Sequence, residues 1–398
     1  MSGDRLLTTE EVARRLGVKK ATVYAYVSRG LLGSHRNADG KESLFAEPEV
    51  TAFAARRRRP AAVPDAPAIH TGITLITGDD LFFRGHRAGE LATTASFESV
   101  ATLLWTGKLE HIPVEPDPDL LALARAVTAP LPATTRLTDR LRVTVAAIAA
   151  ADRLRFDTTP AAVIARGRTI IGTMVAALPV RAQPPQSPAL ADNLWARLTE
   201  RPPTPADLVA LNAALVLLAD HDLAASTFAA RVAASTRAHP YAVVQAGLAA
   251  LDGPLHGAAS EVVAGLLTEA TRSGDPVGTI ADRLRADGSV PGFGNPLYPA
   301  GDPRAAVLLG LLGESPATVD QRSVRAAMAR HSGAAPTIDF ALAAFTMATG
   351  MPADAGEAIF AVARTAGWIA HALEEYADEP SRFRPSGRYA GRSPRAAG

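Results

Sequence analysis

Helical periodicity is the dominant feature of this chain. From position 97 onward, Ala, Leu and Val recur every three or four residues along one segment after another, which is the spacing of an amphipathic helix. Aromatic residues make up only 5% of the sequence, and this shortage favours helices over β-sandwiches or barrels. We therefore expect an all-α fold class. The predicted helices span 97–107, 120–127, 137–154, 160–178, 208–218, 224–251, 260–273, 304–312, 341–349 and 355–375.

Two segments depart from this pattern. Residues 72–86 contain β-branched side chains and a Gly-Asp pair, which together predict a short hairpin. Residues 178–205 are rich in proline, which breaks helices, so we expect irregular structure there around one short helix.

The composition excludes several classes of protein. The sequence holds no cysteine, which rules out disulfides, thiolate catalysis and Cys-ligated zinc. No apolar run approaches the roughly 20 residues that a membrane-spanning helix needs. The N-terminus lacks the charged and apolar regions of a signal peptide. We expect a cytoplasmic protein with no membrane partner.

A linker divides the chain. A length of 398 residues is too great for one ordinary core, and the segment from Pro60 to Pro67 is rich in Pro and Ala. We predict a first domain over 1–59, a linker over 60–69, a second domain over 70–392 and a tail over 393–398.

The first domain has the pattern of a winged helix-turn-helix. Thr8 and Glu11 form a capping-box pattern at the start of one helix. Gly17 suits the tight turn that follows, and a second helix runs through Val23. The pair at 39–40, Asp-Gly, marks a hairpin turn that suits a wing.

Charge is unevenly distributed along the chain. Residues 1–60 hold 12 Lys/Arg against 7 Asp/Glu, whereas the other 338 residues hold 29 against 33. This domain resembles the small DNA-binding domains of excisionase- and MerR-type proteins over about 6–58. The resemblance implies DNA contacts from residues on or beside the second helix. An alternative is a helical appendage used for dimerisation or targeting. The predicted DNA-binding residues are Lys19, Lys20, Thr22 and Arg29.

Three polar segments interrupt the helices of the second domain. The first, 251–259, places His256 between glycines and a proline, where the backbone can approach a ligand closely. The second, 291–304, contains Gly292-Phe293-Gly294, whose glycines free backbone N–H groups to meet a ligand. The third, 336–340, places Asp339 at a helix start, where the helix dipole favours an ionised carboxylate.

Together these segments resemble the citrate synthase family. Its histidine motif resembles 253–257, its second site loop resembles 292–304, and its C-terminal block resembles 338–340 with 363–371. The family's earlier histidine matches His221, and its N-terminal region resembles 84–109. The likeness spans about 72–392 in the expected order. It implies large and small helical domains, the small one over roughly 222–335.

The resemblance also implies roles for individual residues. Asp339 matches the base that removes a proton beside the acyl thioester. His256 matches the neutral histidine that donates a hydrogen bond to the thioester oxygen. His221 matches a ligand of oxaloacetate. The family's three arginines, which bind the carboxylates of oxaloacetate, match Arg304, Arg364 and Arg384.

One position departs from the family pattern. The family has a histidine after Gly-Phe-Gly, which polarises the ketone of oxaloacetate and protonates the new alkoxide, whereas this chain has Asn295. An amide can donate a hydrogen bond to the ketone but cannot release a proton. Loss of a general acid lowers a rate by about 10²–10⁴-fold.

The resemblance implies that this chain condenses acetyl-CoA (or propionyl-CoA) with oxaloacetate, the reaction that opens the tricarboxylic acid cycle. It implies a homodimer, because the arginine matched by Arg384 reaches the neighbouring subunit's site. No cofactor would be bound permanently. No metal site is expected either, because His371 and Glu374 lack a third ligand. The alternative is a DNA-binding regulator whose second domain senses oxaloacetate or an acyl-CoA.

Overall fold

The computed structural model describes residues 6–16, 18–28, 32–36, 43–58, 69–183, 187–253, 256–257, 259–313, 319–385 and 391. The chain divides into two compact units, Met1–Ile69 with Gly387–Gly398, and His70–Ser386. The predicted linker at 60–69 and tail at 393–398 lie almost wholly outside the described residues, so their boundaries stay predictions.

The first unit contains the predicted helices and hairpin strands, together with the strand β1, which was not predicted. Its three strands form an antiparallel sheet in the order β1-β3-β2. The capping box is confirmed, because Thr8 N–H donates to Glu11 Oε2 (2.8 Å) and Glu11 N–H donates to Thr8 Oγ1 (3.3 Å). The Asp-Gly turn at 39–40 lies outside the described residues. The elements are β1 (Leu6–Thr8), α1 (Thr9–Leu16), α2 (Lys20–Ser28), β2 (His35–Arg36), β3 (Ser43–Ala46) and α3 (Glu47–Arg58).

The second unit is a helical body with one small sheet. The sheet confirms the predicted hairpin: β4 (Thr74–Thr77), β5 (Asp80–Phe83) and β6 (His86–Arg87) pair antiparallel in that order. The helices that follow are α4 (Ala88–Thr94), α5 (Phe97–Thr106), α6 (Pro118–Thr128), α7 (Leu137–Ala151), α8 (Pro160–Ala176), α9 (Leu190–Leu198), α10 (Pro205–Leu218), α11 (Ala225–Ser235), α12 (Pro240–Leu251), α13 (Ala259–Ser273), α14 (Pro276–Asp287), α15 (Pro303–Leu312), α16 (Val319–Ser332), α17 (Ile338–Ala348) and α18 (Ala355–Ala377).

Local signals set many helix starts. A proline occupies the first turn of α6, α10 and α15, where its missing N–H costs nothing. The residue before each proline, Asp117, Thr204 or Asp302, accepts a hydrogen bond from the first turn. The same chemistry explains one difference from prediction. The single helix expected over 224–251 is two helices, because Pro240 begins α12 and His239 caps it.

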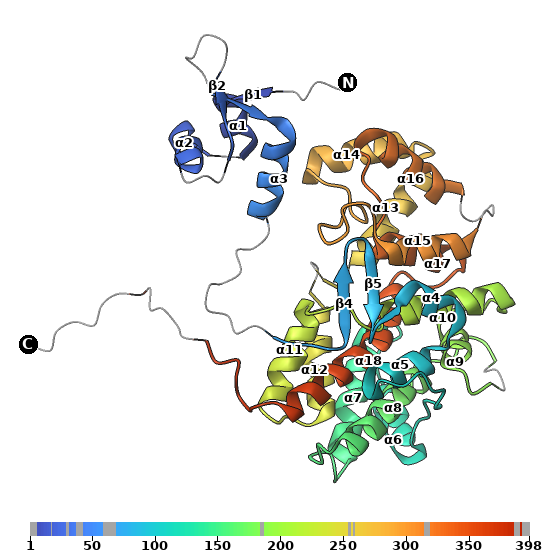
Figure 1. Cartoon of the computed structure of the whole chain (residues 1–398). Helices are drawn as coiled ribbons and strands as arrows, with labels where there is room; N and C mark the ends of the chain where they lie inside the picture. The colour runs from blue at the N-terminus through green and yellow to red at the C-terminus, as the bar shows by residue number, and fades with distance from the viewer. Residues whose placement is uncertain are drawn as a thin grey trace, which may run out of the picture. The chain divides into compact units, whose positions relative to one another are not determined.

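α18 lies at the centre of the main core. It runs through the middle of the helical body and contacts α5, α7, α8, α10, α11 and α12 (Figure 1). Nearly every residue from Ala355 to Ala372 is buried, so this helix is covered on all sides rather than along one stripe. Its polar residues are therefore held in fixed surroundings, and Arg364 is one of them.

A second, smaller core lies beside the first. It gathers apolar residues of α13, α14 and α16 with Phe340 and Ala343 on one side of α17. The opposite side of α17, with Ala341 and Phe345, belongs to the main core. The small domain was expected over 222–335, whereas α11 and α12 pack in the main core and the second core begins at Val263. α17 therefore joins the two cores, and Asp339 lies in its first turn.

Candidate active site

The loop between α10 and α11 carries His221. Gly367 of α18 donates its N–H to the carbonyl of Ala219 (3.0 Å). A Cβ added at Gly367 would lie 2.4 Å from Asp220 Oδ1, so only glycine allows α18 to approach this loop so closely. Asp220 is fully buried and accepts a hydrogen bond from Thr74 Oγ1 (2.5 Å). The loop is thus fixed on two sides.

His221 faces Tyr298 of the second loop. Its Nε2 lies 2.8 Å from Tyr298 Oη, and the two rings are tilted at 55°. Burial and the positive charges of Arg304 and Arg364 lower the pKa of His221 well below 6.5. Burial raises the pKa of Tyr298 to about 12. Both rings are therefore neutral at physiological pH, and each can act as a hydrogen-bonding group only.

Arg304 is paired within its own loop. Its Nε and Nη2 donate to the two carboxylate oxygens of Asp302, at 3.0 and 2.8 Å. Asp302 also accepts from the N–H of Ile338 (3.1 Å), which ties the start of α15 to the start of α17. From sequence, Arg304 is expected to bind a substrate carboxylate, with a pair to nearby Asp302 as the alternative. The structure shows the Asp302 pair, which occupies two of its donor groups and leaves Nη1 for another partner.

Arg364 differs from Arg304 in having few hydrogen-bond partners. It is 1% exposed, and its Nε donates to the carbonyl of Leu218 (2.8 Å). Its Nη1 and Nη2 make no hydrogen bond to any described residue. The guanidinium lies 4.6 Å from the ring centre of Phe360, and burial lowers its pKa to about 10. A buried cation with two unsatisfied donor groups requires an anionic ligand to offset its desolvation.

His256 is held in one orientation by Ser226. Ser226 N–H donates to His256 Nε2 (3.3 Å), and Ser226 Oγ lies 2.7 Å from the same atom. Because Nε2 acts as an acceptor, the ring proton lies on Nδ1. Burial, reinforced by the charge of Arg364, lowers the pKa of His256 to about 4. The residue is therefore a neutral imidazole with a fixed Nδ1–H donor.

The loop with Gly292 to Gly294 is joined to the segment before Asp339. Thr337 N–H donates to the carbonyl of Gly292, and Gly294 N–H donates to that of Ala335, each at 2.9 Å. Phe293 packs against Phe340 (4.9 Å between ring centres). The expectation that Gly294 offers a free N–H is wrong, since Ala335 takes it. The glycines instead permit positive φ angles of 84° and 77°.

Asp339 and Asn295 lie in the same region. Asp339 is half-buried, and burial raises its pKa above 3.8, although Arg304 acts in the opposite direction. Asn295 Oδ1 accepts the N–H of Leu297 (3.0 Å), which leaves the amide NH₂ as its available donor. Asn295 and Tyr298 line a cavity of about 360 Å³ together with Asp302 and residues 333–335.

The structure therefore brings together most of the predicted site. Charge interactions link His221 with His256, and link Arg364 with both Arg304 and Asp339. Arg384 is not among them; it is exposed in the segment after α18. Two partners that fix this site were missed from sequence. They are Tyr298, within the loop 292–304, and Ser226, five residues after His221.

Two further findings concern metals and membranes. No group of His, Asp and Glu side chains within the described ranges is arranged to hold a metal ion. His371, considered above as half of a metal pair, instead lies between Arg231 (2.6 Å) and Asp220 (3.3 Å). None of the described helices is long and apolar enough to cross a membrane.

The predicted DNA-binding residues lie around α2. Lys19 and Lys20 are exposed, and Lys20 Nζ pairs with Glu10 (2.9 Å). Thr22 is half-buried, and Arg29 lies outside the described residues. Tyr26 packs on Phe53 in the core, while Tyr24, 54% exposed, faces solvent.

Comparison with known proteins identifies the second unit. Residues 63–386 match the family model of the citrate synthase C-terminal domain, and residues 6–58 match that of a helix-turn-helix domain. The citrate synthase of Haloferax volcanii is 32% identical over 357 residues, covering 80% of this chain and 92% of that protein. The 2-methylcitrate synthase 2 of Corynebacterium glutamicum is 29% identical, covering 80% and 90%.

A solved structure agrees with this assignment. Citrate synthase from Thermoplasma acidophilum, in a ternary complex with carboxymethyl coenzyme A and oxaloacetate, superposes with a TM-score of 0.71 at 25% identity. The match covers 84% of this chain and 96% of that one. With a family model that spans most of its length and a relative that is 32% identical and covered over 92% of its own length, the chain belongs to the citrate synthase family.

Proposed function

We propose that this chain condenses an acyl-CoA, either acetyl-CoA or propionyl-CoA, with oxaloacetate to give CoA and citrate or a methylcitrate. The single observation that carries the proposal is Arg364, a fully buried guanidinium with two unpartnered donor groups beside two neutral histidines. Such a cation fits one carboxylate of a dianion. Family membership adds the reaction type.

The oxaloacetate site would be built from three cations and a histidine. Arg364 offers Nη1 and Nη2 to one carboxylate in a bidentate arrangement. Arg304 offers its remaining Nη1, and His221 adds a hydrogen bond beside Tyr298. The third cation, Arg384, would come from the partner subunit, which accounts for its exposure outside the cluster.

Asp339 and His256 would act on the acyl-CoA. The Asp339 carboxylate takes a proton from the carbon next to the thioester, and the negative charge moves to the thioester oxygen. His256 Nδ1–H donates to that oxygen and stabilises it. The carbon then attacks the ketone carbon of oxaloacetate, forming the new C–C bond and an alkoxide. The alkoxide takes up a proton, and water cleaves the thioester to release the CoA thiol.

Asn295 would hold the ketone oxygen without supplying a proton. Its Oδ1 is occupied by Leu297 N–H, so the amide NH₂ is the group free to donate. The alkoxide must then be protonated by water, and we expect slow turnover. The 360 Å³ cavity beside Asn295 offers a place for the acyl-CoA to enter.

The test is a thiol-release assay with oxaloacetate and either acetyl-CoA or propionyl-CoA. We expect CoA thiol to appear only when both substrates are present, and Asp339→Asn to abolish it. If oxaloacetate binds but neither acyl-CoA gives thiol release, the proposal that the chain is an enzyme is refuted. That result would favour a regulator that senses a ligand.

We also propose that residues 1–59 bind DNA. The support is the helix-turn-helix match at 6–58 and the exposed Lys19 and Lys20 beside α2. A gel shift at increasing salt tests it, because each phosphate contact adds about 0.9 to the slope of log affinity against log salt. We expect deletion of 1–60 to remove the shift and Lys19→Gln to lower the slope. A shift that survives the deletion would refute the proposal.

We further propose a homodimer in which Arg384 completes the partner's site. Subunit complementation tests this directly. Asp339→Asn and Arg384→Gln each disable a site when present alone. In a mixed dimer, one site carries both changes and the other carries neither, so co-expression should restore activity. Failure to restore it, with mixed dimers isolated, would place Arg384 outside catalysis.

A further inference from the structure

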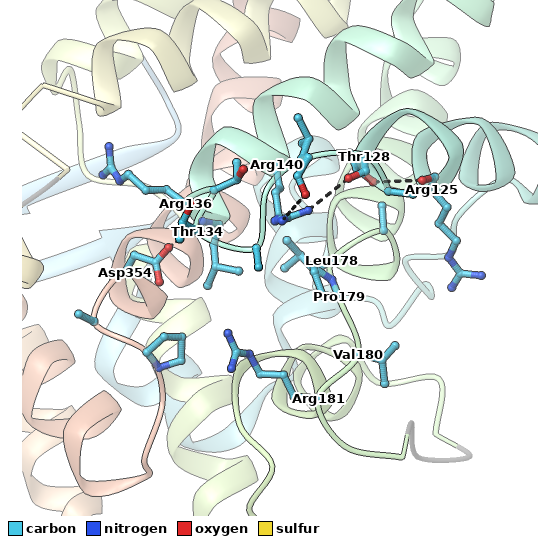
Figure 2. A pocket seen from close by; sticks show the side chains of 18 of the residues that line it. Arg125, Thr128, Thr134, Arg136, Arg140, Leu178, Pro179, Val180, Arg181 and Asp354 are labelled. Atoms are coloured by element: carbon cyan, nitrogen blue, oxygen red, sulfur yellow. Dashed lines mark hydrogen bonds between the residues drawn. The ribbon is translucent and has the colours of Figure 1, made fainter.

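A second cavity lies apart from the candidate active site. It has a volume of about 960 Å³ and is formed by the end of α6, the start of α7 and the end of α8 (Figure 2). None of the residues proposed above to bind substrate lines it. Its size is within the range of small-molecule sites, about 300–1,000 Å³.

The wall of this cavity is rich in arginine. Arg140 is 8% exposed and donates to the carbonyls of Thr128, Leu131 and Pro132, and no carboxylate of the described residues forms an ion pair with it. The side chain of Arg181 is exposed and makes no hydrogen bond or ion pair with any residue that the structure describes. Figure 2 shows these two side chains entering the cavity from different segments of its wall.

Two more guanidinium groups increase the positive charge nearby. Arg125, which lines the cavity, and Arg197, which is 4% exposed, both donate to the carbonyl of Ala176, at 3.2 and 3.4 Å. No described carboxylate pairs with either of them. The acidic lining residues are Glu261 and Asp354, and Asp354 already accepts the N–H of Leu137 (2.7 Å). The excess of cations favours an anionic ligand.

We propose that this cavity binds a small aliphatic dianion, held by Arg140 and Arg181. Guanidinium groups bind carboxylate and phosphate through paired hydrogen bonds. The lining also includes three threonines and several aliphatic residues, of which Leu131, Leu178 and Val180 offer apolar surface to a short hydrocarbon segment. No aromatic side chain lines the cavity, so a nucleobase would have no ring to stack on.

Arg136 connects the cavity to the candidate active site. It lines the cavity and forms ion pairs with Glu357 of α18 and with Asp252 (3.0 Å). Asp252 ends α12 and begins the loop that carries His256. A bound anion competes for Arg136 and weakens its ion pair with Asp252, which is then held by Arg142 alone (3.2 Å) among the described residues. The ligand therefore lowers kcat without competing with oxaloacetate.

Titration calorimetry tests the site with two probes, glycerol 3-phosphate for phosphate and adipate for dicarboxylate. Saturating oxaloacetate keeps both out of the active site. We expect at least one probe to bind, and Arg181→Gln to weaken it about tenfold or more, because a charge-assisted hydrogen bond is lost. Arg272→Gln, an exposed arginine of α13 outside the cavity, is the matched control and should leave the affinity unchanged.

Failure of both probes to bind, or equal affinity in Arg181→Gln and the native protein, would overturn the site. The proposed effect of the ligand on His256 rests on the proposed condensation. It is tested separately, by measuring thiol release at saturating substrate concentrations. We expect the probe to lower kcat in the native protein and in Arg272→Gln, but not in Arg181→Gln. Binding that leaves kcat unchanged would overturn that connection. Because calorimetry needs no turnover, failure of the site and failure of the proposed reaction are distinguishable.

Discussion

Replacing Arg364 by methionine separates a ligand-binding role from a structural one. In the free protein its Nη1 and Nη2 have no partner among the described residues, and the side chain is buried. A carboxylate of oxaloacetate would satisfy both groups. Two charge-assisted hydrogen bonds contribute about 1.5–3 kcal/mol each. Arg364→Met should therefore weaken oxaloacetate binding by about 10²–10⁴-fold, where each 1.4 kcal/mol is tenfold.

The effect on folding should be much smaller, because opposing terms nearly cancel. Removing a buried unpaired cation relieves a desolvation penalty of several kcal/mol. The substitution also loses the bond from Nε to Leu218, about 1.5–3 kcal/mol. It loses the contact with Phe360 as well, about 0.5–2 kcal/mol. We expect the free energy of unfolding to change by less than about 2 kcal/mol.

Calorimetric titration with oxaloacetate and thermal unfolding with and without it provide the measurements. Ligand at 100 times its Kd stabilises a protein by about 2.7 kcal/mol. The native protein should therefore melt a few degrees higher with oxaloacetate, and Arg364→Met should not. Arg197→Met is the matched control, another buried arginine bonded to main-chain carbonyls. The reasoning is refuted if Arg364→Met keeps its oxaloacetate affinity, or if it unfolds several kcal/mol more easily than Arg197→Met.

Three further predictions concern catalysis. Asn295→His should raise thiol release by about 10²–10⁴-fold, because it restores a general acid; an unchanged or lower kcat would mean that the loop serves another substrate. Burial raises the pKa of Asp339, and the base must be ionised. The value of kcat/KM should therefore fall as the pH drops through that raised pKa, at a higher pH than an exposed aspartate would give. A pH–rate profile with no such acidic limb would argue against Asp339 as the base. Ser226→Ala removes the Oγ contact to His256 and keeps the backbone one, and it should lower kcat about tenfold, the value of one hydrogen bond, while calorimetry finds oxaloacetate affinity unchanged; a loss of affinity instead would give Ser226 a binding role.

Much of the fold follows from local signals that are visible in the sequence. Proline in the first turn, with a polar residue before it, sets the start of α6, α10 and α15. The hairpin of β4 and β5 also comes from a local turn. One failure of prediction was a helix break within an apolar run, at Pro240. Another was that α14 and α16 were not predicted as helices, because few apolar residues mark their buried faces.

The motifs also identified which side chains carry chemistry, because His256, Asp339 and Arg364 each lie in a distinctive sequence context. Their states of pairing depend on residues far away in the chain. Sequence alone did not reveal that Ser226 fixes the tautomer of His256. It left open whether Asp302 or a ligand pairs with Arg304, and the structure shows that Asp302 accepts from its Nε and Nη2.

The sequence by itself determined the helical class, the order of the motifs and the residue types available for a dianion and a thioester. Only the tertiary structure decided which of these groups have hydrogen-bond partners within the protein and which are available to a ligand. The physical reason is that helix caps and turns are settled by neighbours three or four residues away. Desolvation and hydrogen-bond pairing are instead set by whatever the fold brings near. Among the described residues, the fold brings one carbonyl and no carboxylate within hydrogen-bonding distance of Arg364, and that deficit defines the site.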